Sequence, residues 1–79
     1  MDPNSVALQK IIASYCPVSY QNVDLSVVLQ DHYVPTPERD SFSSDICAKW
    51  PNIDCTVLHN QMFNPLQTGN NILTFIAAS

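Results

Sequence analysis

The segment from Pro35 to Pro51 constrains the fold most, because it carries signals for both ends of one helix. Thr36 can act as the N-cap residue, and Pro37 fits the first turn, where the missing N–H of proline costs nothing. Pro51 ends the helix, since the residue before a proline is pushed out of the α region. The sequence therefore predicts a helix that begins at Pro37, after the Thr36 cap, and runs to Trp50.

One face of this helix is apolar. Phe42, Ile46 and Trp50 recur every four residues with Cys47 beside them, which is the spacing of one helical face. Trp50 is the only tryptophan of the chain, so we expect this face to anchor the hydrophobic core.

A second helix is predicted over residues 4–15. Asp2 and Pro3 repeat the combination of a capping residue and a first-turn proline, and Pro17 ends the segment. The apolar residues between these signals have helical spacing: Leu8, Ile11, Ile12 and Tyr15.

Residues 22–34 fit two patterns. Apolar residues alternate with more polar ones, which predicts a strand with one solvated face, at Val23, Leu25, Val27 and Leu29. Residues 24–33 also match a helical template with Asp24 as its cap, so a helix stays open as the alternative. The β-branched content favours the strand.

Two further strands are predicted in the C-terminal half. Residues 53–63 begin with an alternating pattern at Ile53, Cys55 and Val57, and residues 71–77 are a nearly continuous apolar run. Continuous runs are typical of strands that are covered on both faces. Turn composition separates the two strands at Asn64-Pro65 and around the only glycine, Gly69.

These elements predict an α+β fold in which two helices pack on a small, mainly antiparallel three-stranded sheet. A mostly helical small bundle is the alternative, and it follows if residues 24–33 are helical. The length of 79 residues predicts a single small globular domain over residues 1–79, alone or within a longer chain. The predicted core residues are Leu8, Ile11, Ile12, Leu25, Val27, Leu29, Phe42, Ile46, Trp50, Val57, Leu73, Phe75 and Ile76.

The net charge of −4 argues against several classes of partner. The fixed cations are Lys10, Arg39 and Lys49, and three scattered cations cannot neutralise a run of phosphates. We therefore expect no nucleic-acid partner. The sequence has no apolar run long enough to span a membrane and no signal peptide, so the protein is expected to be soluble, intracellular and cytoplasmic.

The cysteines, at Cys16, Cys47 and Cys55, are odd in number, which favours reduced thiols that pack as small apolar residues. A disulfide between Cys47 and Cys55 remains open, and it would stabilise the fold by about 2–3 kcal/mol. A zinc site using Cys47, Cys55 and His59 is a further alternative. Its Cys-x3-His spacing brings two ligands to one ion only on a helix, because residues four apart on a strand are about 13 Å apart.

No enzyme activity, bound metal or cofactor is expected. His32 and His59 could pair with a cysteine or serine nucleophile, but no oxyanion-hole glycine motif accompanies them. A phosphate-binding glycine loop is excluded because the chain has a single glycine. No residue is therefore predicted to be catalytic, cofactor-binding or metal-ligating.

The apolar segment at the end of the chain is the best candidate for function. An unpaired apolar strand at a sheet edge can pair with another chain, so Ile72, Phe75 and Ile76 are the predicted interaction residues. The function predicted is a non-enzymatic protein–protein interaction module, acting as a homodimer or by docking on a partner protein. The alternative is a small zinc-stabilised regulatory module using Cys47, Cys55 and His59.

The composition adds an expectation about origin. Charged residues are only 13% of the chain, and polar character comes from Ser, Asn, Gln and Thr, which do not keep copies of a chain apart. The scarcity of Gly, Glu and Lys fits an accessory protein of a compact viral genome, which would act in the host cell.

Overall fold

The structure, a computed structural model, describes residues 2–63 and 66–78. These residues form five α-helices: α1 (Pro3–Ala13), α2 (Leu29–His32), α3 (Arg39–Lys49), α4 (Cys55–Met62) and α5 (Gly69–Ala78). Two 3-10 helices lie between them, η1 (Tyr20–Asn22) and η2 (Thr36–Glu38).

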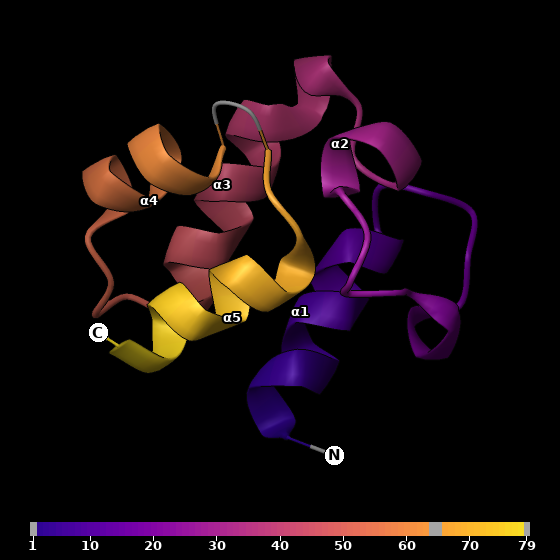
Figure 1. Cartoon of the computed structure of the whole chain (residues 1–79), viewed down its shortest axis with the longest axis horizontal. Coiled ribbons are helices and arrows are strands. Elements are labelled where there is room, and N and C mark those ends of the chain that lie inside the picture. The colour runs from indigo at the N-terminus through magenta and orange to yellow at the C-terminus, as the bar shows by residue number, and fades with distance from the viewer. Residues whose placement is uncertain (1, 64–65, 79) are drawn as a thin grey trace.

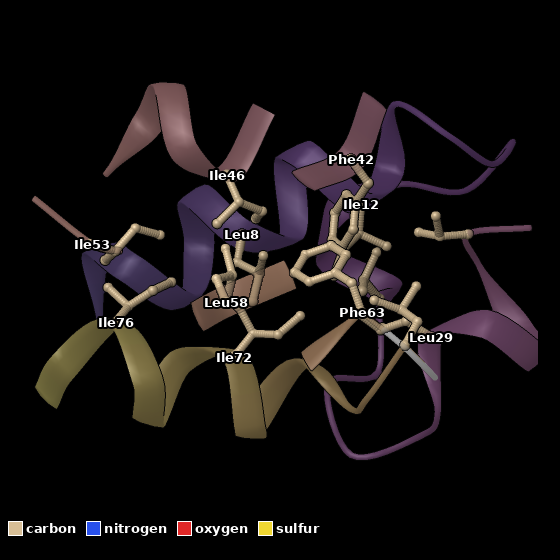
Figure 2. Packing of buried hydrophobic residues seen from close by; sticks show 13 residues of the cluster. Leu8, Ile12, Leu29, Phe42, Ile46, Ile53, Leu58, Phe63, Ile72 and Ile76 are labelled. Atoms are coloured by element: carbon tan, nitrogen blue, oxygen red, sulfur yellow. The ribbon is translucent and has the colours of Figure 1, made fainter. Parts of the chain in front are cut away.

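Four of the helices surround a single core. α1 packs against α3 and α5, and α4 packs against the same two helices, so that the four form a ring (Figure 1). Figure 2 shows side chains from all four helices pointing into the space that the ring encloses: Leu8, Ile12, Phe42, Ile46, Leu58, Ile72 and Ile76.

The predicted three-stranded sheet is wrong. The described residues contain no strand, and their β-type pairs are two isolated bridges, Val28 with Thr68 and Phe63 with Leu66. The alternative, a mostly helical small bundle, fits the structure.

Both predicted helices are confirmed, with one correction at a cap. The Asp2 carboxylate accepts a hydrogen bond from the Ser5 N–H at 3.3 Å and so caps α1. α3 ends at Lys49, one residue before the predicted end at Trp50. Thr36 does not cap it, because Thr36 opens η2 and α3 begins after that 3-10 turn without a side-chain cap.

A local turn replaces the strand predicted over residues 22–34. The Asp24 carboxylate accepts hydrogen bonds from the Ser26 N–H at 2.9 Å and from the Ser26 hydroxyl at 2.5 Å. These bonds stabilise the charged carboxylate and lower the pKa of Asp24. A side chain that satisfies nearby backbone groups competes with strand pairing, so the extended pattern ends here and the short α2 follows.

The strand predicted over residues 53–63 is α4. Asp54 accepts hydrogen bonds from the N–H groups of Thr56 at 3.0 Å and Val57 at 3.2 Å, which starts a helix. The helix then turns Leu58 into the core, where it is fully buried. The capping bonds of Asp54 therefore outweigh the alternating pattern.

The strand predicted over residues 71–77 is α5. The Thr68 hydroxyl accepts a hydrogen bond from the Asn71 N–H at 3.3 Å at the start of this helix. Ile72 and Ile76 are four residues apart, share its inner face and are both buried. The turn predicted at Asn64-Pro65 lies outside the described residues.

Gly69 lies where α5 passes close to the turn before α2. A Cβ atom at Gly69 would be 2.5 Å from Leu25 Cδ2 and 3.3 Å from Leu25 Cα. The Asn70 N–H donates to the Leu25 carbonyl at 3.0 Å in the same place. A side chain at residue 69 would therefore force Leu25 to shift.

The buried core differs in part from the predicted one. Leu8, Ile12, Leu29, Phe42, Ile46 and Ile76 are buried as predicted. The other predicted residues are only half-buried: Ile11, Leu25, Val27, Trp50, Val57, Leu73 and Phe75. The prediction missed Val23, Val34, Ile53, Leu58, Phe63, Leu66 and Ile72, which are buried.

The environment of Tyr15 predicts that the fold loses stability at alkaline pH. Burial and a hydrogen bond that its hydroxyl donates to the Asp45 carboxylate raise the pKa of Tyr15 above its ordinary value of 10.0. As the pH rises above about 10, the unfolded chain loses this proton while the folded chain keeps it, so the free energy of unfolding falls.

We expect Tyr15→Phe to show a smaller fall in the free energy of unfolding between about pH 9 and 11 than the wild type. Urea denaturation across this pH range measures the free energy of unfolding of both proteins. Titration of Cys16 contributes equally to both and cancels from the comparison. Parallel pH profiles would show that the Tyr15 hydroxyl is not held in the folded state.

Candidate functional site

A hollow of about 520 Å³ lies between α1 and the end of α3. The residues that line it are Pro3, Val6, Ala7, Lys10, Ile11 and Lys49. Apart from the two lysines, every one of these side chains is apolar. This combination of an apolar floor and a few polar groups is typical of a binding site.

The helical geometry of α1 places apolar side chains on two of its sides. Leu8 and Ile12 are fully buried and face the core. Val6 lies about 200° around the helix from Leu8, at 3.6 residues per turn, so it cannot share that face. Val6, Ala7 and Ile11 are half-buried in the isolated chain and line the hollow. Ile11, about 60° from Leu8 on the helix, also packs against the core.

A second hollow of about 330 Å³ adjoins the first, and Lys49 lines both. The indole N–H of Trp50 donates to the Asn4 side-chain oxygen at 3.1 Å, which ties the end of α3 to the start of α1. The two hollows therefore have a common, fixed wall. We call the residues of both the Lys49 surface: Pro3, Asn4, Val6, Ala7, Lys10, Ile11, Lys49, Trp50, Pro51, Asn52, Ile53 and Ile76.

The Lys49 surface is positive on a negative protein. The chain has a net charge of −4, and its fixed cations number three. Lys10 and Lys49 both lie on this surface, and none of the described residues that line it is acidic. The Lys10 ammonium is 5.1 Å from the centre of the Tyr20 ring, a cation–π contact that restrains the charged group.

The predicted interaction residues lie in α5 instead of a strand. Ile72 is fully buried and Ile76 is 6% exposed, while Phe75 is half-buried. Ile76 lines the edge of the second hollow and Ile72 lies in the core, so the structure does not bring the three together on one open surface.

The three residues of the alternative zinc site are arranged differently from a metal centre. The sulfurs of Cys47 and Cys55 are joined in a disulfide, with Cα atoms 6.0 Å apart, whereas the sequence favoured reduced thiols. Within residues 2–63 and 66–78, no group of three or more Cys, His, Asp or Glu side chains could hold a metal ion. The His59 ring instead stacks on Phe63, with ring centres 6.3 Å apart.

Cys16 is the free cysteine among the described residues. Its thiol donates to the Ile12 carbonyl at 3.6 Å, and burial raises its pKa. A raised pKa lowers the fraction of thiolate, which is the nucleophilic form. Cys16 therefore has the character of a packing residue and not of an activated nucleophile.

Comparison with known proteins finds no matching family model, curated protein or solved structure. In the described part of the chain, no helix has the length and apolar character needed to cross a bilayer.

Sequence reasoning missed the Lys49 surface. The signal was present in α1, where Val6 does not fall on the same side as Leu8 and Ile12. No local sequence pattern predicts that Lys49 and Trp50 lie beside α1, because this contact depends on how two helices distant in sequence pack together.

Proposed function

We propose that this chain is a non-catalytic protein–protein interaction domain that docks on a partner protein through the Lys49 surface. One observation carries the proposal: two adjoining hollows place half-buried apolar side chains of α1 beside the only tryptophan of the chain. Tryptophan is enriched among the residues that dominate binding energy at protein interfaces.

Two bonds that restrain the surface support docking. The hydrogen bond from Trp50 to Asn4 and the disulfide between Cys47 and Cys55 both restrain the segment that forms one wall. A preformed surface loses little conformational freedom on binding, which leaves more of the contact energy as affinity.

The function is tested by selecting displayed random peptides on the full chain and measuring the affinity of the enriched peptides for two variants. Ala7→Gln fills the first hollow without changing charge. Ala77→Gln makes the same change at an exposed position of α5, away from the hollows.

We expect Ala7→Gln to weaken binding of the enriched peptides about tenfold or more, and Ala77→Gln to leave it within about twofold. Failure to enrich any peptide, or equal affinity for Ala7→Gln and the wild type, would contradict docking at this surface. Far-UV circular dichroism of both variants establishes that each is folded.

A further inference from the structure

We infer that the segment bound at the Lys49 surface is an acidic amphipathic helix, with an apolar face for the hollow and carboxylates for Lys10 and Lys49. This inference rests on the docking function proposed above and adds the chemistry of the partner.

Charge is the first argument. Lys10 and Lys49 line a hollow whose other side chains are apolar, and no acidic residue among the described lining residues neutralises them. A partner with carboxylates at the edge of its contact face complements this charge, while a basic partner meets repulsion. The net charge of −4 makes the local excess of cations a property of this surface and not of the whole chain.

Shape is the second argument. Pro3, Ala7 and Lys10 follow one another along α1 at the spacing of a helical ridge. Ala7, in the middle of this ridge, has a small side chain that allows another helix to approach closely. A helix that lays its apolar face along α1 would place residues one turn apart over the hollow, as in other helix-in-groove complexes.

The same charges disfavour a second copy as the occupant. A symmetric dimer places the same surface on both sides of the contact, so each copy brings Lys10 and Lys49 and no acidic lining residue to pair with them. Like charges at close range destabilise such a contact. A foreign acidic helix therefore fits the Lys49 surface better than self-association does.

Two designed peptides test the inference against the full chain. Both are helical with the same leucine stripe, and their flanking positions are all Glu in one and all Lys in the other. We expect the Glu peptide to bind saturably and the Lys peptide to bind at least about tenfold more weakly. Rising salt concentration should lower the affinity for the Glu peptide, because salt screens the attraction between exposed charges.

Charge variants locate the contact. Lys10→Gln and Lys49→Gln should each lower the affinity for the Glu peptide about threefold, since each removes one charge. The double variant should lower it about tenfold. Gln61→Glu is the matched control, because it lowers the net charge by the same amount at an exposed position of α4. It should leave the affinity within about twofold.

The outcomes separate the two proposals. Equal binding of both peptides, with sensitivity to Ala7→Gln retained, overturns the acidic helix and leaves the docking function standing. Binding of display-selected peptides but of neither designed peptide does the same. A dimer in native mass spectrometry that Ala7→Gln dissociates makes a second copy the occupant and also overturns the inference.

Discussion

Phe42→Ala is expected to lower the free energy of unfolding by about 3–5 kcal/mol, because it empties the centre of the core. Phe42 is fully buried in α3. Its ring meets Tyr15 edge to face at 5.6 Å between ring centres and lies tilted against Phe63 at 5.4 Å. Truncation to alanine removes both aromatic contacts and leaves a cavity that the surrounding helices fill only in part.

A loss of this size matters in so small a domain. Native domains are stable by about 5–15 kcal/mol, and a chain of 79 residues buries less of its surface than a larger one. Phe42→Ala should therefore lose a large fraction of the total free energy of unfolding. Urea denaturation followed by far-UV circular dichroism measures the change.

Two variants of α3 serve as controls for this prediction. Phe42→Leu keeps an apolar side chain that fills most of the volume, so it should lower the free energy of unfolding by less than Phe42→Ala does. Ser41→Ala changes the exposed neighbour and should stay within about 0.5 kcal/mol of the wild type. A Phe42→Ala protein as stable as Ser41→Ala would place Phe42 outside the packed core.

The sequence predicted the helices whose signals agree with one another. In α1, Asp2 caps the first turn and Leu8 and Ile12 repeat at helical spacing, so the local and the packing signals coincide. In α3, Phe42 and Ile46 repeat in the same way before Pro51 stops the helix. Such agreement leaves one conformation favoured at every level.

The prediction was wrong where two signals conflict. Around Asp54, alternating apolar residues favour a strand. The Asp54 carboxylate favours a helix instead, because it accepts hydrogen bonds from the N–H groups of Thr56 and Val57 and so caps the first turn. In α5, a continuous apolar run fits a buried strand as well as a helix. Periodicity cannot separate these alternatives, and the packing of Ile72 and Leu58 into the same core decides between them.

The Lys49 surface could be predicted only in part. That α1 carries an apolar residue facing away from the core follows from the position of Val6 on a helix. The contribution of Lys49 and Trp50 depends on the crossing of α1 and α3, which no local pattern specifies. The disulfide stood as an open alternative, because the sequence separation of Cys47 and Cys55 permits it without requiring it.

The disulfide between Cys47 and Cys55 is expected to stabilise the fold by about 2.5 kcal/mol, from the loop-closure entropy of a sequence separation of 8. It joins the last turn of α3 to the first residue of α4. We expect the double variant Cys47→Ser with Cys55→Ser to lose about this much, and a reductant to lower the stability of the wild type alike. Urea denaturation with and without reductant measures both effects.

Cys16 provides the control, because its thiol is free and Cys16→Ala should leave the response to reductant intact. The intact mass of the wild type without reductant should be lower by two hydrogens than that of the fully reduced chain. A reduced chain in this measurement, or an unfolding midpoint that a reductant does not change, would show that the disulfide does not form. The segment between the two cysteines carries Lys49 and Trp50, so reduction frees one wall of the Lys49 surface. We therefore expect a reductant to weaken peptide binding at this surface as well, because a wall that moves must be ordered again on binding.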